Sequence, residues 1–305
     1  MRAVSQRVFG GPEVLEVVDL ERPRPAPGEA LVRVAAAGVN PGDKNIRAGK
    51  VAQFGGPPFT LGSDVSGTVV DVAPDMTRLE PGDAVFGLVA MGAYAEYVAA
   101  PGEHLAIKPP ALDHVTAAAL PVAGLTAWQG LAELADVQPG ERVLIHAAAG
   151  GVGHLAVQVA KLRGAHVIGT ARAAKHDFLR DLGADELVDY TATDFTQAVH
   201  DVDVVLDLVG GDYGARSLDA LRPGGLLITA TLDPGVTEQD ATEQGRRLAA
   251  LWVRPSAPML ETLAEHVVAG RLRIAVERTF AFEDAAIAAR LSDSGRVAGK
   301  LVLVA

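Results

Sequence analysis

Cysteine is absent from this sequence of 305 residues. Its absence excludes disulfide bonds, a thiolate nucleophile and every zinc site that depends on cysteine. The eight histidines are scattered, and no two of them have the His-x-x-x-His spacing of a helical metal site. We therefore expect no metal requirement.

Long apolar runs and basic residues are also scarce. The longest largely apolar stretch, residues 116–128, is interrupted by proline and glycine and is shorter than the ~20 residues of a membrane-spanning helix. Residues 1–6 contain no apolar signal-peptide run, so we expect a cytoplasmic protein with no membrane partner. The net charge of −11 argues against a nucleic-acid partner but leaves room for a local phosphate pocket.

The order of strand-like and helix-like segments predicts two domains. Residues 1–121 are mostly β, because short runs such as 30–34 and 66–70 are separated by turns rich in glycine and proline. From residue 122 to 269 strands and helices alternate, which predicts a parallel sheet with helices on both faces. Strands are expected at 142–148, 166–170, 186–190, 203–209 and 225–230, and helices at 151–163, 174–182 and 213–221. Two late strands, 273–276 and 300–304, should rejoin the first domain, which then comprises 1–121 and 270–305.

A glycine-rich turn lies between the first strand and first helix of the alternating region. Residues 147–153 read Ala-Ala-Ala-Gly-Gly-Val-Gly, which departs from the usual Gly-x-Gly-x-x-Gly spacing. Glycines let a backbone approach a ligand closely, and the N–H groups at a helix start bind phosphate. Because a strand precedes the turn, a helix follows it and further strands and helices alternate after it, we interpret the turn as a dinucleotide pyrophosphate site.

The end of the second strand indicates which dinucleotide is bound. Folds that bind NAD place an acidic residue there for the ribose 2′-hydroxyl, whereas this chain continues as Thr170-Ala171-Arg172-Ala173-Ala174-Lys175. Arg172 and Lys175 could hold a 2′-phosphate through charge-assisted hydrogen bonds, or they are solvated charges at a helix start. Cations are disfavoured at a helix start, so a bound anion explains them better and favours NADPH.

Several segments together resemble one family. They are Ala37–Asp43, Gly62–Val69, Pro81–Val85, Gly92–Val98, Leu120–Trp128, the glycine turn, Leu182–Asp185 and Gly299–Leu303. Over nearly the whole chain these segments resemble the medium-chain dehydrogenase/reductase superfamily, specifically its zinc-independent quinone oxidoreductase (zeta-crystallin-like) branch. The resemblance implies an α/β protein with a doubly wound Rossmann domain, residues 122–269, and a mostly β, GroES-like catalytic domain.

The resemblance also separates this chain from the zinc-dependent alcohol dehydrogenases of the superfamily. Those enzymes place a cysteine ligand near the position of Asn40 and a Gly-His-Glu triplet where Gly62-Ser63-Asp64 stands. Their structural lobe with four cysteines is missing as well. Alcohol oxidation through a zinc-bound alkoxide is therefore not expected.

The resemblance implies a set of cofactor-binding residues. Asn40 and Thr126 would lie beside the nicotinamide, and Gly150, Gly151 and Val152 would hold the pyrophosphate. The 2′-phosphate end would involve Thr170, Arg172, Lys175 and Tyr190. Val209 and Gly210 would line the ribose side, Thr231 would lie near the carboxamide, and Lys300 belongs to the closing Gly-Lys motif with a less defined role.

Structural explanations remain open for several of these residues. Tyr190 could simply pack at a strand end, and Asn40 could serve the turn at Pro41. Asp43 and Asp64 are expected to make hydrogen bonds that stabilise the fold. His146 is expected in the core, and Tyr94 and Tyr97 are expected to pack in strands.

Three functions are compatible with the sequence. The first is a zinc-free reductase that transfers hydride from NADPH to a quinone or an activated enone. The second is an NADPH-dependent enoyl-thioester reductase, which in this family usually has a tyrosine proton donor after the Asn-Pro-x-Asp segment; residues 47–56 contain none. The third is a non-catalytic, crystallin-like NADPH-binding protein.

Residues 232–253 follow the last expected strand of the alternating region. The polar segment 232–247 has few apolar residues and is expected to be a loop or lid. The apolar run 248–253 could form an edge strand that pairs across a two-fold axis, so we expect a homodimer.

Overall fold

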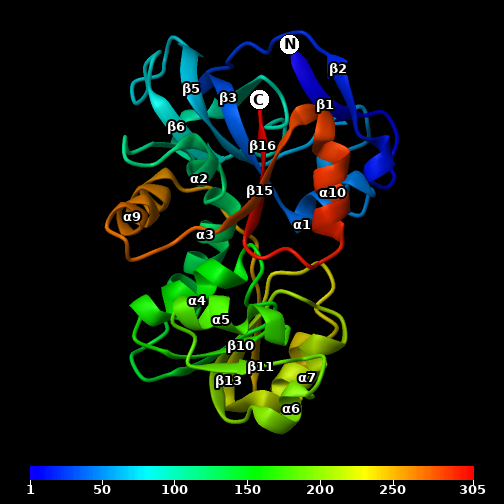
Figure 1. The fold of residues 1–305 in the computed structure, drawn as a ribbon, viewed down its shortest axis with the longest axis vertical. Helices are drawn as coiled ribbons and strands as arrows, with labels where there is room; N and C mark the ends of the chain where they lie inside the picture. The colour runs from blue at the N-terminus through cyan, green and yellow to red at the C-terminus, as the bar shows by residue number, and fades with distance from the viewer. The chain divides into compact units, whose positions relative to one another are not determined.

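The computed structural model describes residues 1–305 and divides the chain into two units (Figure 1). The first unit contains Met1–Leu125, Pro255–Gly270 and Ile274–Ala305, and the second contains Thr126–Arg254 and Arg271–Arg273. The boundary lies within helix α3 (Pro121–Trp128). No helix is both long enough and apolar enough to cross a lipid bilayer.

The first unit is built around two β-sheets. A seven-stranded sheet has the order β15-β16-β3-β5-β6-β8, with β7 also paired to β3, and a three-stranded sheet has the order β2-β1-β4. Their bounds are β1 Arg2–Gln6, β2 Glu16–Asp19, β3 Glu29–Val39, β4 Phe59–Thr60, β5 Asp64–Val72, β6 Ala84–Leu88, β7 Tyr97–Pro101, β8 Leu105–Ile107, β15 Val276–Ala281 and β16 Lys300–Val304. One apolar core joins side chains such as Val32, Val65 and Leu301 from neighbouring strands. This mostly β unit agrees with the predicted fold class.

The chain end returns to this unit as predicted, but one strand lies elsewhere than expected. Strand β16 pairs antiparallel with β3 and parallel with β15, and Figure 1 shows β15 and β16 side by side. The predicted strand at 273–276 is wrong, because β15 begins at Val276. The backbone of Arg273 instead forms two hydrogen bonds with the Gln158 side chain, at 2.7 and 2.9 Å, so it is not available to a sheet.

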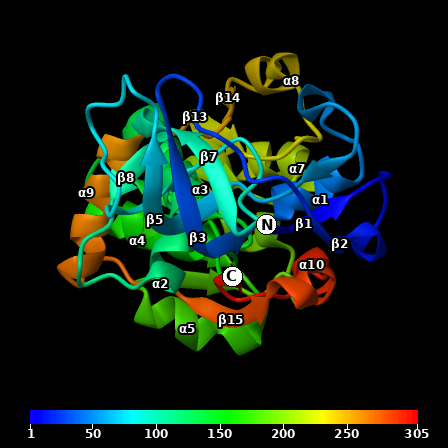
Figure 2. The same ribbon diagram turned by 90° about the horizontal axis from the view of Figure 1, so that it is seen from above.

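Helix α9 (Ala257–Val268) belongs to the first unit, although the sequence placed it in the nucleotide-binding domain. Glu261 of this helix forms an ion pair with Arg78 at 2.6 Å, and Figure 2 shows the helix beside β8. Leu263 lies only 3.1 Å from the position that a Cβ on Gly124 would take. These contacts within the first unit explain the difference from the predicted boundary. The other helices of this unit are α1 Pro41–Arg47, α2 His114–Ala118 and α10 Ala285–Asp293.

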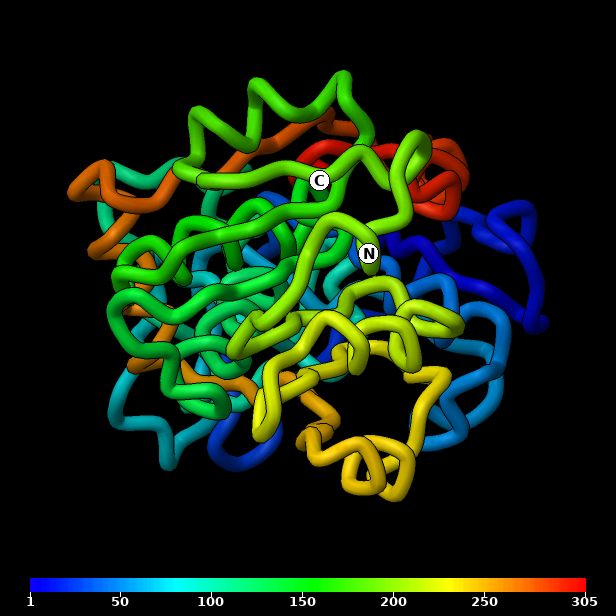
Figure 3. The backbone as a smooth tube through the Cα atoms, turned by 90° about the horizontal axis from the view of Figure 1, so that it is seen from below, coloured from blue at the N-terminus to red at the C-terminus, as the bar shows by residue number.

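The second unit contains a six-stranded, entirely parallel sheet, as predicted. Its order is β11-β10-β9-β12-β13-β14. Figure 3 traces the backbone of this unit as the mostly green and yellow part of the tube. The strands are β9 Arg142–Ile145, β10 His166–Thr170, β11 Glu186–Val188, β12 Val202–Asp207, β13 Leu221–Thr229 and β14 Arg247–Ala250. The helices are α4 Gly153–Leu162, α5 His176–Asp181, α6 Phe195–Ala198, α7 Asp212–Ala220 and α8 Glu238–Glu243.

Strand β9 is the point at which the strand order of this sheet reverses. The next strand, β10, pairs on one side of β9, whereas β12 pairs on the other side. In open parallel sheets a ligand crevice forms beyond the carboxyl ends of the strands at such a reversal. The glycine turn directly follows β9, so the topology places it where a dinucleotide binds.

The predicted loop at 232–247 contains a short helix, so that prediction is wrong in part. Helix α8 is stabilised at its start by Thr237, whose N–H donates to the Asp240 carboxylate at 2.9 Å while its hydroxyl accepts from the Asp240 N–H at 3.2 Å. Figure 2 shows α8 in gold. Strand β14 (Arg247–Ala250) then forms one edge of the sheet, which agrees with the expected edge strand, but it begins one residue earlier than the predicted 248–253 and ends three residues sooner.

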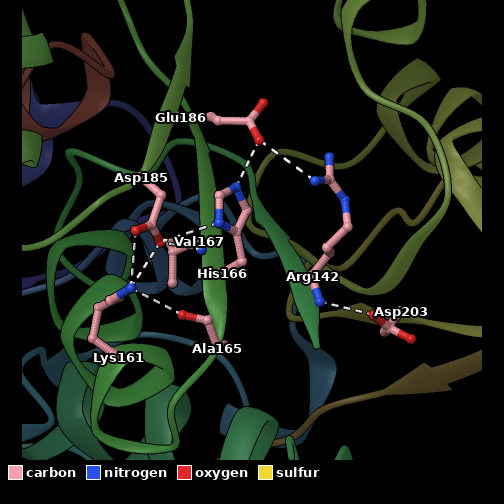
Figure 4. Close-up of polar contacts among 8 residues, drawn as sticks. All are labelled: Arg142, Lys161, Ala165, His166, Val167, Asp185, Glu186 and Asp203. Atoms are coloured by element: carbon pink, nitrogen blue, oxygen red, sulfur yellow. Dashed lines mark hydrogen bonds and ion pairs between the residues drawn. The ribbon is translucent and has the colours of Figure 1, made fainter. Parts of the chain in front are cut away.

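A network of charged side chains joins the amino ends of β9, β10 and β11 (Figure 4). Glu186 lies 2.6 Å from His166 and 3.5 Å from Arg142. Lys161 donates to Asp185 at 2.8 Å, and Asp185 also accepts the N–H of Val167 at 2.7 Å. These contacts lie at the opposite strand ends from the glycine turn, so the network stabilises the sheet away from the candidate site.

Candidate cofactor and active site

The glycine turn joins β9 directly to α4. Ala147 has φ +48°, in the left-handed region, and its carbonyl accepts the N–H of Gly150 at 2.9 Å. A Cβ on Gly153 would lie 2.3 Å from the carbonyl oxygen of Ala147 and 2.6 Å from that of Ala148. The helix start therefore packs on the turn so closely that only glycine fits at position 153.

The predicted pyrophosphate residues lie at the surface of this turn. Gly150, Gly151 and Val152 are half-buried, and they directly precede the first turn of α4. The N–H groups of Gly151 and Val152 have no acceptor within the protein. Unpaired N–H groups at the start of a ten-residue helix provide a suitable site for a phosphate.

A buried hydrogen-bonded chain lies beneath the turn. Ser217 donates its hydroxyl hydrogen to the carbonyl of Tyr213 at 2.6 Å, so it accepts from Nε2–H of His146 at 3.0 Å. Nδ1 of His146 then accepts from the Thr170 hydroxyl at 3.1 Å. Burial lowers the pKa of His146 to about 3, so the ring is neutral and can play both roles.

These hydrogen bonds bear on the predictions for His146 and Thr170. His146 is fully buried, which confirms its predicted core position. Thr170 is 1% exposed, and its hydroxyl hydrogen is directed at His146. Its carbonyl also accepts the N–H of Ala148 at 3.1 Å. The side chain of Thr170 therefore supports the turn from the protein interior and does not lie at the surface with Arg172, Lys175 and Tyr190.

The structure brings two of the predicted 2′-phosphate residues into contact. Nε of Arg172 donates to the hydroxyl oxygen of Tyr190 at 3.0 Å, and both side chains are exposed. This hydrogen bond raises the pKa of Arg172, and it leaves the phenolic hydrogen of Tyr190 free to donate. Lys175 lies at the end of the same short connection, with its backbone N–H bonded to the Arg172 carbonyl at 2.8 Å.

One acidic residue follows the neighbouring strand β11. Asp189 accepts both the N–H and the hydroxyl of Thr191, at 2.9 and 2.7 Å, and these bonds lower the pKa of its carboxyl. No acid follows β10 itself, where an NAD-binding fold has its ribose ligand. The exposed groups of Arg172 and Tyr190 therefore present donors suited to an anion.

The carboxyl ends of β12 and β13 bring together three more predicted residues. Asp207 accepts the N–H groups of Val209 at 2.9 Å and Gly210 at 3.1 Å, and burial raises the pKa of its carboxyl. Gly210 has φ +77°, and a Cβ there would lie 2.8 Å from the hydroxyl oxygen of Thr231. Gly210 and Thr231 thus lie against each other at these strand ends, next to Val209, which is 46% exposed.

The first unit contains a separate buried polar cluster around Lys300. Its ammonium donates to the Val39 carbonyl at 3.2 Å, to Oδ1 of Asn40 at 2.5 Å and to Oδ2 of Asp64 at 3.0 Å. Nδ2 of Asn40 also donates to Oδ2 of Asp64 at 3.0 Å. The sheet register explains the cluster, because β3 ends beside the first residues of both β5 and β16.

Glycine at position 38 makes room for this cluster. A Cβ on Gly38 would lie 2.6 Å from Oδ2 of Asp64 and 2.5 Å from the carbonyl oxygen of Ala118. The other oxygen of Asp64 accepts the N–H of Val122 at 2.7 Å, and Asp64 is fully buried. The predicted hydrogen-bonding role of Asp64 in the fold is therefore confirmed.

Asp43 and Tyr94 extend the cluster on its other side. Oδ2 of Asp43 accepts the Asn40 N–H at 2.9 Å and the Tyr94 hydroxyl at 2.6 Å, which confirms the hydrogen-bonding role predicted for Asp43. Burial raises the pKa of Asp43 to about 6, against the opposing effect of these two hydrogen bonds, and burial also raises the pKa of Tyr94. Tyr94 precedes strand β7, so the prediction that it packs within a strand is wrong, whereas Tyr97 begins that strand.

Thr126 is the remaining predicted residue. It is 5% exposed and lies in α3, at the first position of the second unit. The predicted site residues thus form two groups, Asn40 and Lys300 in the first unit and the others in the second.

Sequence reasoning overlooked several residues that shape these groups. Gly153 lies in the predicted pyrophosphate turn, and its packing on two carbonyl oxygens reveals its role. Asp207 precedes the Val-Gly-Gly turn, which is a recognisable position for an acid that binds backbone N–H groups. Gly38 lies in a segment that resembles the family, but its packing role depends on a carboxylate 26 residues away.

The structure contains no group of three or more His, Cys, Asp or Glu side chains that could hold a metal ion. The cofactor that the fold implies is a dinucleotide, and the residues present fit it. The glycine turn has unpaired N–H groups, and Arg172 with Tyr190 provides a second donor group at the end of the adjacent strand.

Two family models match the chain. The alcohol dehydrogenase GroES-like domain matches residues 26–110, and the zinc-binding dehydrogenase model matches residues 182–303. The chain is 34% identical to 2-haloacrylate reductase from a Burkholderia species, over 97% of this chain and 96% of that protein.

Two solved structures are also close to this chain. The quinone oxidoreductase from Coxiella burnetii superposes with a TM-score of 0.97 at 38% identity, covering 100% of this chain and 99% of that one. The Escherichia coli quinone oxidoreductase complexed with NADPH superposes with a TM-score of 0.94 at 29% identity, covering 100% of both chains.

Proposed function

Because the chain belongs to the medium-chain dehydrogenase/reductase superfamily, we propose that it is an NADPH-dependent reductase that acts on a quinone or an activated enone without zinc. The predicted family resemblance and the predicted α/β fold class are confirmed. The chain is thus an oxidoreductase, and its acceptor and its independence of zinc are proposals.

The observation that carries the choice of NADPH is the contact between Arg172 and Tyr190 beyond the end of β10. An exposed guanidinium beside an uncommitted phenolic hydrogen suits a phosphate, and no acid follows β10 for a ribose hydroxyl. The E. coli neighbour is described as complexed with NADPH, which supports the same cofactor. When bound, NADPH supplies a hydride.

The groups that the chain provides indicate which class of molecule can accept the hydride. Neither a metal nor cysteine is proposed to take part, so the acceptor itself must delocalise the electron pair that it gains. In an enone the hydride adds to the β-carbon, the C=C bond becomes an enolate, and a proton from water completes the saturated ketone. The relative named 2-haloacrylate reductase supports an electron-poor alkene as one acceptor class.

The direct test is steady-state NADPH oxidation by the purified, metal-free protein with a simple quinone and with a simple enone. We expect turnover with at least one of them and no loss of activity with a chelator. Tight NADPH binding without turnover of either acceptor would instead favour the enoyl-thioester or non-catalytic alternatives. Inhibition by a chelator would contradict the zinc-free proposal.

A further inference from the structure

One buried imidazole in the second unit joins the three segments that carry the proposed cofactor residues. His146 directly precedes the pyrophosphate turn. Its Nδ1 meets the hydroxyl of Thr170, the last residue of β10, and its Nε2 meets the hydroxyl of Ser217 in α7, the helix that follows Gly210. The pyrophosphate turn, the strand end before Arg172 and the helix after Gly210 therefore converge on a single side chain.

The surroundings of His146 hold its ring in place. The rings of Phe195 and Tyr213 pack edge-on against it, with centroids 4.6 and 4.9 Å away, and His146 is fully buried. A side chain in this position cannot contact a cofactor. The neutral ring has one donor and one acceptor, and both are used within the protein, so its polar atoms serve only to join these segments.

The bond between His146 and Thr170 fastens the end of β10 to the pyrophosphate turn. A second hydrogen bond between the same segments joins the Thr170 carbonyl to the N–H of Ala148 at 3.1 Å. Arg172 lies two residues beyond Thr170, and Gly151 lies three residues beyond Ala148. These two hydrogen bonds therefore set the spacing between the exposed guanidinium and the unpaired N–H groups of the turn.

We propose that His146 is a positioning residue for NADPH, which holds the pyrophosphate turn and the 2′-phosphate end at the spacing that lets one dinucleotide reach both. This inference rests on the NADPH-binding part of the proposed function and not on the acceptor. The link through Thr170 sets the spacing, whereas the link through Ser217 fixes the ring. Loss of the first link should reduce the affinity that a ligand gains from its 2′-phosphate.

Two fragments of the cofactor measure that gain without the nicotinamide. They are 2′-phospho-ADP-ribose and ADP-ribose, which differ only in the 2′-phosphate, and the ratio of their Kd values follows from calorimetric titration. The wild type should bind the first more tightly. His146→Phe keeps an aromatic ring without either nitrogen, and it should reduce the ratio about fivefold, as expected for the loss of one internal hydrogen bond. An unchanged ratio in His146→Phe would overturn the inference.

Two variants that each keep one half of the imidazole locate the effect. The amide oxygen in His146→Asn can replace Nδ1 and accept from Thr170, whereas the amide nitrogen in His146→Gln can replace Nε2 and donate to Ser217. We expect His146→Asn to keep most of the wild-type ratio and His146→Gln to lose it, as His146→Phe does. The opposite order would contradict the role of the Thr170 link.

A double-mutant cycle tests the same link from its other end. Thr170→Val removes the donor hydroxyl and should lower the ratio about fivefold in the wild type but less than about twofold in a His146→Phe background, because both changes break one link. Equal losses in the two backgrounds would contradict the link. Thr170→Val also carries the test if His146→Phe does not fold.

Phe195→Leu is the control for a purely structural effect. It removes part of the packing against the His146 ring but neither of its hydrogen bonds, so it should destabilise the protein and leave the ratio unchanged. If Phe195→Leu lowers the ratio as far as His146→Phe does, packing alone explains the effect and the inference is overturned.

Amide hydrogen exchange in the protein without ligand separates failure of this inference from failure of the proposed function. The Ala148 N–H, which bonds to the Thr170 carbonyl, should exchange at least tenfold faster in His146→Phe than in the wild type, relative to the N–H groups within β9. Unchanged exchange at Ala148 would contradict the positioning role. A wild type that binds both fragments equally would contradict the proposed 2′-phosphate site, and exchange at Ala148 would still decide whether His146 holds the turn.

Discussion

At the scale of single residues, the two candidate groups differ in how their charges are solvated. The cations in the second unit, Arg172 and Lys175, lie at least partly in solvent, where a ligand phosphate can reach them. Lys300 and Asp64 are buried and satisfy each other within the protein. Charges of the first kind suit direct recognition of a ligand, whereas charges of the second kind suit the positioning of a neighbouring side chain.

The 2′-phosphate contact can be tested by removing both cations. Arg172→Ala with Lys175→Ala should weaken NADPH binding at least tenfold and change NADH binding less than threefold, because only NADPH has the 2′-phosphate. Fluorescence titration measures both Kd values. Arg180→Ala is the control, since Arg180 is also an exposed cation but pairs with Asp177 at 2.7 Å on α5. Equal weakening of NADPH and NADH would contradict this role.

Asp43 should lower the stability of the protein as the pH rises, which is the opposite of the effect of a carboxyl group whose pKa is lowered by folding. Burial raises its pKa to about 6, so between about pH 4 and pH 6 the folded state holds a proton that the unfolded state has lost. The contribution of the protonated Asp43 carboxyl to the free energy of unfolding is therefore fully present below about pH 4 and is lost as the pH rises to 6. The free energy of unfolding should fall by up to about 3 kcal/mol across this window, and Asp43→Asn should remove that fall.

Denaturant unfolding at a series of pH values measures this effect. Asp185→Asn provides a contrast, because the hydrogen bonds from Lys161 and Val167 outweigh burial and lower the pKa of the Asp185 carboxyl. Its contribution is present above the unfolded-state pKa and is lost as the pH falls through the folded-state value. Parallel stability curves for the wild type and Asp43→Asn would show that Asp43 does not titrate in this way.

Residues with local signals were predictable, and residues with distant partners were not. Arg172 and Lys175 stand out because an acid is missing at the end of a strand. The role of Lys300 depends on Asn40 and Asp64, which lie 260 and 236 positions away, so no local pattern could reveal it. Tyr94 resembles an ordinary packed aromatic until the Asp43 carboxylate is seen beside its hydroxyl.

At the scale of elements, the turn between β9 and α4 connects sequence to function most directly. Its glycines have unequal roles. A Cβ on Gly150 would lie 3.2 Å from the Ala147 carbonyl oxygen, whereas one on Gly153 would lie 2.3 Å from the same atom. The first contact needs only a small adjustment, but the second forces the helix start away from the turn.

Gly153→Ala should therefore weaken NADPH binding at least tenfold and destabilise the protein by about 1–3 kcal/mol, because the clash is with backbone atoms. Gly150→Ala is the matched control and should have a clearly smaller effect on both quantities. Titration with NADPH and thermal unfolding provide the measurements. If Gly153→Ala binds NADPH as tightly as Gly150→Ala, the close packing of helix and turn is not required.

Most strands and helices of the second unit follow from periodicity and glycine positions, and the exceptions have physical causes. The segment 232–247 has few apolar residues, so α8 had no apolar face to indicate a helix, although Thr237 and Asp240 form a recognisable helix start. The late strand was misplaced because the backbone of Arg273 bonds to Gln158 instead of a strand. A local helix start decided the first case, and a contact between residues 115 positions apart decided the second.

At the scale of the whole molecule, the edge of the second sheet remains the proposed dimer contact. Strand β14 pairs only with β13, and Trp252, two residues beyond its end, is 61% exposed. An unpaired strand edge beside a large exposed aromatic side chain favours pairing with a second copy across a two-fold axis.

Sedimentation equilibrium should give twice the 31.6 kDa mass of one chain at micromolar concentration. Trp252→Ser should shift the equilibrium toward the monomer without changing the fold, because the side chain is mostly in solvent. A wild-type mass of one chain under these conditions would contradict the proposed dimer.

The central claim is that this protein transfers hydride from NADPH directly to an activated acceptor. The measurement is the mass of the product formed from an enone and NADPH deuterated at its transferable position. An enone is preferable to a quinone, because deuterium added to carbon is retained, whereas hydrogen on a hydroquinone oxygen exchanges with water. We predict one deuterium on the β-carbon of the saturated ketone. Product without deuterium, or no product from any enone or quinone tested, would contradict the account.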